Sequence, residues 1–258
     1  MTSCVRAIVA SCDLTSPTVD QDLAQLKEAS LKVRGVRWIL DCIGPYEPGT
    51  ATHVGTMRHD GIDYLRGGDN GNATSEFEHG FEMLAKHDLS FDLQCAPVQL
   101  AKASGLCAKH PNVKVCIDHL GKVRSLLGLD EPSNTNTMPN AEELDEWRRN
   151  MALVATLPQV YVKNSMLGYA VPGWIRSPVR VELVKQLVRE TVDLFGPHRC
   201  MVALNWWKDG PTSDADGLSN VGPDPVQFLQ FMSSFFEDYS DEDRERLFAG
   251  TAREFYRF

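Results

Sequence analysis

The chain has 258 residues, of which 43% are hydrophobic and 24% are charged, as is typical of a soluble globular protein with a sizeable core. Its net charge of −9 and its pI near 5.3 argue against nucleic acid or an anionic membrane as a partner. The sequence shows neither an apolar stretch long enough to span a bilayer nor a secretory signal, so we expect a cytoplasmic protein.

Short apolar runs alternate with segments of helical spacing along the chain. The predicted strands are residues 5–10, 33–40, 89–93, 113–117, 160–162 and 200–204. The predicted helices are residues 19–29, 76–86, 98–109, 141–155 and 178–194, followed by an apolar-rich helix after Pro225 and another that opens at Ser240. This alternation predicts a parallel sheet with covering helices, in a single domain spanning residues 1–258.

Seven cysteines form no Cys-x-x-Cys pair and lie mostly in apolar runs, so we expect reduced, buried thiols. Two connections, residues 42–74 and 205–224, are too long for simple turns. Each follows the C-terminal end of a predicted strand, where α/β proteins carry their sites. They are either functional lids or flexible insertions.

Polar side chains gather at the ends of the predicted strands. Residues 113–122 are the clearest case, because an apolar run stops at Asp118-His119 and then meets a glycine and a lysine. His119 is a candidate for polarising a carbonyl or activating a water, although it could equally cap a strand. The other candidates are Arg37, Gln94, Lys163, Asn205 and Trp206.

Each of these candidates has a functional and a structural interpretation. Arg37 has the bidentate geometry to clamp a substrate carboxylate, or it forms a structural ion pair with Asp41 or Asp92. Lys163 is either a substrate-binding cation or a strand-end lysine that extends its amine into solvent. Trp206 would form an aromatic wall of a small-molecule pocket or of the sheet's open end.

Several familiar chemistries lack their motifs. The sequence contains neither His-x-His nor His-Glu-x-x-His, and the last predicted strand ends at Asn205 rather than at an aspartate. His119 alone cannot hold zinc, which needs three or four ligands, so we predict no metal site. Gly-x-Ser-x-Gly and Gly-x-Gly-x-x-Gly are also missing, which disfavours serine hydrolysis and dinucleotide binding.

A set of segments in fixed order resembles the amidohydrolase-related family, specifically its lactonase branch, which includes 2-pyrone-4,6-dicarboxylate lactonase and fuconolactonase-like proteins. The segments are Val33-Arg34-Gly35-Val36-Arg37, Phe91-Asp92-Leu93, Ile117-Asp118-His119-Leu120-Gly121-Lys122, Tyr161-Val162-Lys163 and Phe248-Ala249-Gly250-Thr251-Ala252. The resemblance covers nearly the whole chain. It implies an α/β, TIM-barrel-like fold of the metal-dependent-hydrolase type, with six of eight strands present.

The same resemblance implies roles for individual residues. His119 matches the histidine of the family's sixth strand, and Arg37 falls in the strand-four segment that carries a substrate-binding arginine. Asn205 stands where the family usually has the strand-eight aspartate, and an amide can orient a water but cannot take its proton.

The family's first two strands, with their His-x-His, have no counterpart in the sequence. We therefore expect exposed edges on the first and last strands, an interior open to water, and either a truncated chain or a partner segment that fills the gap. A divalent metal such as zinc would bind only if the missing ligands were supplied.

We therefore expect a hydrolase that opens a lactone or a similar carboxylate-bearing ester with an activated water. The partner would be a small anionic lactone, and an oligomer is compatible with the sequence. Two alternatives stay open: a metal-dependent decarboxylase of the aminocarboxymuconate type, and a non-catalytic barrel that binds a small acid or a protein partner.

Overall fold

The computed structural model describes residues 5–42, 62–68, 71–128, 135–204 and 223–258. Six strands form one parallel sheet whose order follows the chain. They are β1 (Ile8–Ser11), β2 (Val33–Ile39), β3 (Ser90–Gln94), β4 (Val115–Ile117), β5 (Val160–Asn164) and β6 (Cys200–Val202). Sequential order in a parallel sheet is the arrangement of a TIM barrel, and β1 and β6 are its two edges among the described strands.

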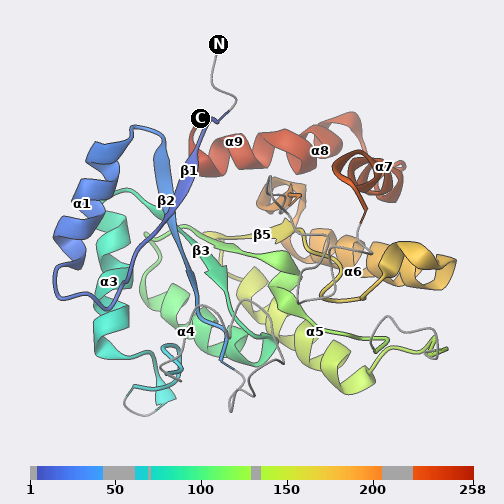
Figure 1. The fold of residues 1–258 in the computed structure, drawn as a ribbon, viewed down its shortest axis with the longest axis horizontal. Coiled ribbons are helices and arrows are strands. Elements are labelled where there is room, and N and C mark those ends of the chain that lie inside the picture. The colour runs from blue at the N-terminus through green and yellow to red at the C-terminus, as the bar shows by residue number, and fades with distance from the viewer. Residues whose placement is uncertain (1–4, 43–61, 69–70, 129–134, 205–222) are drawn as a thin grey trace.

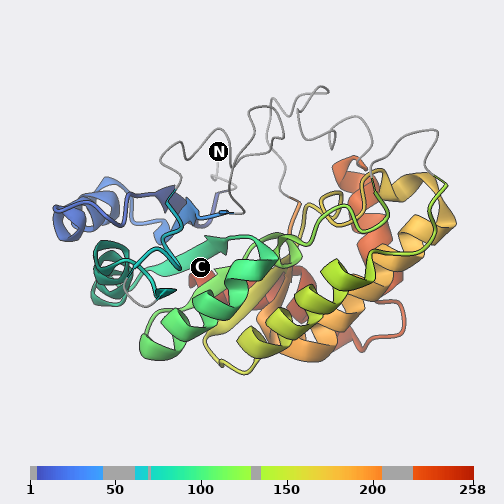
Figure 2. The same ribbon diagram turned by 90° about the horizontal axis from the view of Figure 1, so that it is seen from below.

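Helices surround this sheet in chain order (Figure 1). They are α1 (Val19–Ala29), α3 (Ser75–Lys86), α4 (Leu100–Lys109), α5 (Ala141–Ala155), α6 (Pro178–Phe195), α7 (Pro225–Phe235), α8 (Asp241–Glu245) and α9 (Thr251–Tyr256). Figure 2 shows α4, α5 and α6 side by side along the outside of the sheet. The predicted strands and helices are therefore confirmed, with boundaries that differ by up to three residues. No helix in the described part of the chain is long and apolar enough to cross a membrane.

Alternation along each strand separates two environments. Val36, Phe91, Val115 and Val160 pair in one row across β2 to β5 and belong to the main core, beneath the outer helices. The next row, formed by Arg37, Asp92, Cys116 and Tyr161, faces the inside of the curved sheet. The main core is therefore a layer between sheet and helices. The side chains of the inner row lie outside this core and are available for a functional site.

The inner face of the sheet is not simply open to water, which corrects the expectation from the sequence. Cys116 and Tyr161 form a second buried apolar cluster with Met201 and with Phe255 and Tyr256 of α9. The rings of Tyr161 and Phe255 lie 4.7 Å apart between centroids. Helix α9, which lies beside β1 in Figure 1, thus fills part of the interior that we expected to be open to water.

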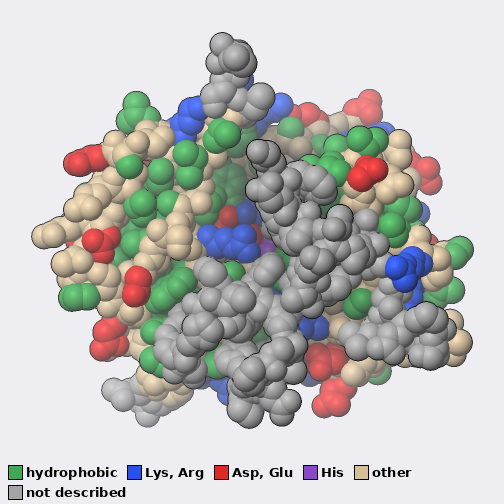
Figure 3. Space-filling view, viewed as in Figure 1, with side chains coloured by type: hydrophobic (Ala, Val, Ile, Leu, Met, Phe, Trp, Pro, Cys, Tyr) green, Lys and Arg blue, Asp and Glu red, His purple; other side chains and the backbone are tan. Residues whose placement is uncertain are grey.

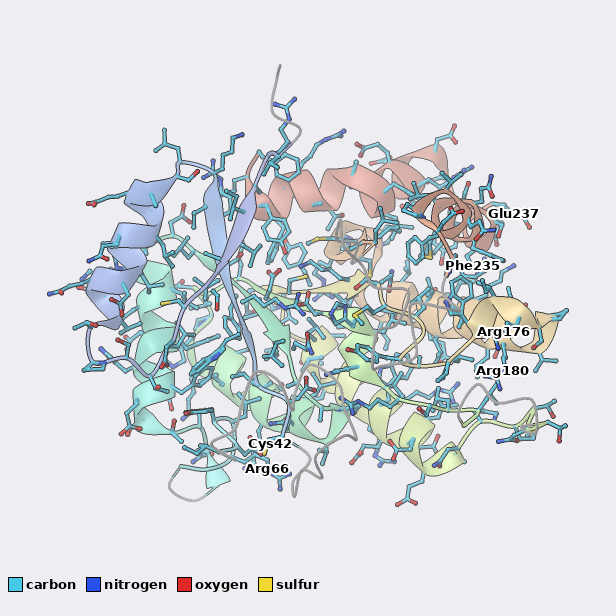
Figure 4. The ribbon with its side chains drawn as sticks, viewed as in Figure 1. Cys42, Arg66, Arg176, Arg180, Phe235 and Glu237 are labelled. Carbon is cyan, nitrogen blue, oxygen red and sulfur yellow. The ribbon has the colours of Figure 1, made fainter. Side chains whose placement is uncertain are left out.

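The described cysteines are free thiols, as expected. Burial raises the pKa of Cys107 to about 12, which keeps that thiol protonated and unreactive. Cys42, labelled in Figure 4, is half-buried, and its backbone N–H donates to Gln99 Oε1 at 2.9 Å.

Candidate active site

Four charged side chains and one histidine form a cluster toward the C-terminal ends of β2 to β5. We call it the strand-end cluster. Its members are Arg37, Asp92, Asp118, His119 and Lys163. Figure 3 shows lysine and arginine side chains gathered near the middle of one face, with acidic and histidine atoms beside them. In parallel barrels this end of the sheet is where functional side chains converge.

Lys163 bridges two buried carboxylates. Its amine contacts Asp92 directly and lies 3.1 Å from Asp118 Oδ1. The hydroxyl of Tyr256 donates to both carboxylate oxygens of Asp92 at 2.8 Å. Burial and the charge of Asp118 raise the pKa of Asp92. Burial by itself would lower the pKa of Lys163, but the two carboxylates outweigh it and the pKa lies well above its usual value. The interpretation of Lys163 as a lysine that extends into solvent is therefore wrong, since its side chain is only 17% exposed.

Arg37 is fixed by three neighbours. Its Nε lies 3.1 Å from Asp118 Oδ2, and its Nη2 donates to Gln94 Oε1 and lies 3.2 Å from His119 Nε2. Burial favours the neutral form of Asp118, but Lys163 and Arg37 outweigh it and lower its pKa. The expected structural pairing of Arg37 with Asp41 or Asp92 is wrong, because its acidic partner is Asp118. The Arg37 side chain is 30% exposed, so part of the guanidinium faces solvent.

His119 is a neutral imidazole in this setting. Burial, reinforced by the charges of Arg37, Lys163 and Lys122, lowers its pKa to about 3. Arginine can only donate, so the contact with Arg37 makes Nε2 the acceptor and places the proton on Nδ1. The Nδ1–H then donates to Ser165 Oγ at 2.8 Å, just after β5. Both ring nitrogens of His119 are therefore engaged, Nδ1 by Ser165 and the Nε2 lone pair by Arg37.

The turn that carries His119 has an unusual backbone. Four consecutive residues have a left-handed backbone, with φ values of 57° at His119, 54° at Leu120, 65° at Gly121 and 59° at Lys122. Only glycine adopts this conformation without steric strain. The indole N–H of Trp147 donates to the Leu120 carbonyl at 2.6 Å and holds the turn against α5. Strain of this kind persists only where surrounding contacts enforce it, and it is concentrated at functional sites.

A second ionic group lies deeper, behind Arg37. The amine of Lys122 contacts Asp41, and both side chains are 0% exposed. Gln94 links this pair to the strand-end cluster, because its Nε2 donates to Asp41 Oδ2 at 2.9 Å while its Oε1 accepts from Arg37. The Lys122 amine also lies 5.1 Å from the centroid of the Tyr169 ring.

The structure brings together four of the six residues singled out from the sequence, Arg37, Gln94, His119 and Lys163. Asn205 and Trp206 lie outside the described residues. The sequence analysis did not select Ser165 as a site residue, although its position directly after a strand could have indicated it. It also missed Tyr256, which nothing in the sequence of α9 connects to Asp92.

The described side chains of the strand-end cluster do not fit a divalent metal. Within the described ranges, no group of three or more histidine, cysteine, aspartate or glutamate side chains is placed to hold one. The lone pair of His119 Nε2 faces the guanidinium of Arg37, and the Lys163 amine occupies the space between Asp92 and Asp118. Arg37 and Lys163 therefore occupy the positions beside these donors that a metal ion would need to take.

A sequential parallel sheet with charged groups at its strand ends defines a barrel-type α/β protein. Residues 8–258 match the amidohydrolase family Amidohydro_2, so the chain belongs to that family. It is similar to L-fucono-1,5-lactonase of Burkholderia ambifaria, with 27% identity over 259 residues that cover 99% of this chain and 72% of that protein. It is also 29% identical over 184 residues to the uncharacterized protein y4mH of Sinorhizobium fredii, covering 71% of this chain. The matched residues cover 52% of the y4mH protein, so the chain spans about half the length of that relative.

Solved structures support the same fold. An amidohydrolase from Burkholderia multivorans with bound zinc aligns with a TM-score of 0.71 and 22% identity, covering 98% of this chain and 74% of that one. A probable 2-pyrone-4,6-dicarboxylic acid hydrolase from Acinetobacter baumannii, solved with citric acid bound, aligns with a TM-score of 0.61 and 14% identity over 97% of this chain and 72% of that one. The family match and the relatives named L-fucono-1,5-lactonase confirm the resemblance, and the solved structures confirm the TIM-barrel-like fold.

Proposed function

We propose that this chain hydrolyses a lactone at the strand-end cluster. The observation that carries the proposal is Arg37, a guanidinium fixed by Asp118, Gln94 and His119 while part of it faces solvent. A preorganised cation of this kind stabilises the oxyanion that forms when water adds to a carbonyl. The relative named L-fucono-1,5-lactonase supports this choice of reaction.

The reaction assigns separate tasks to the cluster. Water forms a bond to the lactone carbonyl, the ring C–O bond breaks, and the departing alkoxide takes up the proton that water loses. Arg37 polarises the carbonyl and binds the carboxylate product. His119 orients Arg37, because its Nε2 lone pair accepts a hydrogen bond from the guanidinium. Because the pKa of His119 is about 3, its ring does not carry the proton of the water away at neutral pH.

The remaining assignments rest on sequence. Asn205 follows β6 and would orient the water, while Trp206 would contact the substrate ring. Gln94 acts by holding Arg37, and Lys163 provides a second partly exposed cation for a substrate oxygen. The chemistry assigned to the described residues includes no metal step, because their donor set does not fit a metal.

The charge of the cluster narrows the substrate class. Within the strand-end cluster and the Lys122–Asp41 pair behind it, three cations are matched by three carboxylates. They are Arg37, Lys122 and Lys163 against Asp41, Asp92 and Asp118. With His119 neutral, these residues offer no excess of positive charge for a dianion. We therefore propose a hydroxylated lactone with at most one carboxylate, in place of a dicarboxylate.

An activity assay with matched histidine variants tests the proposal. We expect the protein to open a neutral sugar 1,5-lactone faster than a pyrone dicarboxylate, followed by proton release at constant pH. His119→Ala should lower turnover by about two orders of magnitude or more while the circular dichroism spectrum stays unchanged. His79→Ala, on the exposed face of α3, is the control and should retain full activity.

Two results would contradict this assignment. Full activity in His119→Ala would remove that residue from the mechanism. Thermal stabilisation of the protein by lactones without any hydrolysis would indicate a binding protein instead of a hydrolase.

A further inference from the structure

A cavity of about 290 Å³ lies at the opposite end of the sheet from the strand-end cluster. It is lined by Lys27, Val33, Arg34, Asp88 and Arg257. Val33 and Arg34 begin β2, Lys27 lies in the last turn of α1, and Arg257 follows α9. Figure 1 shows the end of α1, the start of β2 and the C-terminus close together. The cavity thus joins segments that are far apart in the sequence.

The lining is strongly positive for a protein of net charge −9. Three of the five lining residues are cations and one is an acid. That acid, Asp88, has a side chain that is 77% exposed, and its Oδ2 lies 3.5 Å from Arg257 Nε. An exposed pair at this distance is weak, and Asp88 cancels at most one of the three positive charges of the lining.

Backbone carbonyls hold the cations in place. Lys27 Nζ donates to the His87 carbonyl at 2.6 Å, and Arg34 Nε donates to the Arg257 carbonyl at 3.2 Å. Arg257 Nη2 donates to the Asp88 carbonyl at 2.6 Å. Carbonyl oxygens carry no net charge, so these bonds fix the positions of the cations without cancelling them.

Two of the lining residues also have a strained backbone. Asp88 has a φ of 53° and Arg257 a φ of 55°, the left-handed region that residues other than glycine rarely adopt. The Arg257 guanidinium lies over the start of β2, where its Nη2 contacts the carbonyls of Arg34 and Asp88. Both residues stand at helix ends, after α3 and α9, where a left-handed residue commonly terminates a helix, so this backbone fixes the positions of two lining residues.

We infer that this cavity binds a small anion through a phosphate group. The net charge of its lining is +2, three cations less one acid, which matches a phosphate dianion. Arginine binds phosphate in a bidentate fashion, and a fixed lysine adds a point charge. The cavity volume is at the low end of the range for ligand pockets, which suits a small phosphorylated molecule.

An anion bound at this site would influence the strand-end cluster through α9. Arg257 directly follows Tyr256, whose hydroxyl holds both oxygens of Asp92. An anion bound by Arg257 therefore anchors the end of the helix that positions this tyrosine. The inference itself concerns binding and does not depend on the proposed lactone hydrolysis.

Thermal unfolding with inorganic phosphate tests the site. Phosphate is titrated at constant ionic strength, with chloride and citrate as separate series. We expect phosphate to raise Tm by about 3–5 °C at ten times its Kd, while chloride leaves Tm unchanged and citrate shifts it less. Each variant is compared with its own Tm without ligand, so that a loss of basal stability does not obscure the result.

Charge-removing variants locate the ligand. Lys27→Gln and Arg257→Gln should each reduce the phosphate shift by at least half, and the double variant should abolish it. Arg149→Gln, which removes an exposed charge on α5, and Arg37→Gln in the strand-end cluster should retain the full shift. The inference is overturned by an absent phosphate shift in the wild type, by a shift in Lys27→Gln and Arg257→Gln as large as that of the wild type, or by a larger shift with citrate.

Discussion

Two lysines in this protein pair with buried carboxylates at the C-terminal ends of the strands, and their surroundings differ. Lys122 and Asp41 are fully enclosed, with both side chains 0% exposed. Lys163, between Asp92 and Asp118, is 17% exposed and lies beside the partly exposed Arg37. One pair is sealed inside the protein, and the other borders the face where a substrate would arrive.

The difference teaches how the site is built. A fully enclosed ion pair contributes little net stability compared with apolar residues, but losing one partner leaves a buried charge and is costly. The Lys122–Asp41 pair therefore fixes geometry, since Gln94 transmits its position to Arg37. The Lys163 group keeps exposed polar surface, which a binding site requires. The four predictions below test this division, from the largest expected effect to the smallest.

The largest effect should come from breaking the enclosed pair. Asp41→Ala leaves the Lys122 amine without its carboxylate, and we expect a loss of about 3–5 kcal/mol in the free energy of unfolding. Glu190→Gln, which breaks the exposed pair with Arg148 (2.6 Å), should cost about 1 kcal/mol or less. Urea denaturation measures both. Equal costs for the two variants would show that the Lys122–Asp41 pair is not sealed from solvent.

The next effect concerns the strained turn that presents Lys122 and His119. Gly121 has a φ of 65°, and a Cβ there would lie 2.7 Å from Met151 Sδ. Gly121→Ala should therefore cost about 2–4 kcal/mol through strain and overpacking. Gly105→Ala in α4 is the matched control, since no atom lies within 4 Å of its added Cβ, and it should stabilise the protein by about 0.5–1 kcal/mol. A neutral Gly121→Ala would mean that the turn relaxes freely.

The secondary structure could be read from the sequence because it depends on local patterns. Residues 141–155, for example, combine helical spacing with Asn140, whose side chain accepts hydrogen bonds from the backbone of α5, and the predicted and observed helices coincide. Arg37, Gln94, His119 and Lys163 were also accessible, because alternation and strand ends place such residues on one side of a parallel sheet.

Partner choice could not be read in the same way. Arg37 pairs with Asp118 rather than with Asp41 or Asp92, because the turn after β4 directs Asp118 inward while Lys122 and Lys163 occupy the other two carboxylates. Strand spacing determines which residues share a face, but it does not decide between several nearby carboxylates. The contact of Tyr256 with Asp92 spans 164 residues and depends on how α9 docks, which no local pattern encodes.

A smaller effect should appear in the pH dependence of stability. Folding lowers the pKa of His119 from 6.5 to about 3, so below pH 6.5 the unfolded chain binds a proton that the folded chain does not. Stability should therefore fall as the pH drops through this window, by about 2 kcal/mol between pH 6.5 and pH 5. His119→Gln removes this contribution, and the difference between the two proteins cancels the other titrating groups. Parallel stability curves for the two proteins would show that His119 titrates normally and lies outside the enclosed region.

The smallest effect should come from the hydrogen bond to Asp92 in the Lys163 group, because solvent can partly replace a lost interaction there. Tyr256→Phe removes the hydroxyl that donates to both oxygens of Asp92, while Lys163 continues to balance the carboxylate. We expect a loss of about 1.5 kcal/mol, the lower end for a hydrogen bond to a charged group. Tyr161→Phe is the control, because Tyr161 lies in the same apolar cluster and no hydrogen bond involves its hydroxyl in the described part of the chain, so its cost should stay below about 0.5 kcal/mol. If Tyr256→Phe instead costs as much as Asp41→Ala, Asp92 and Lys163 are as sealed as the deeper pair, and the face beside Arg37 is not a site that a substrate can reach.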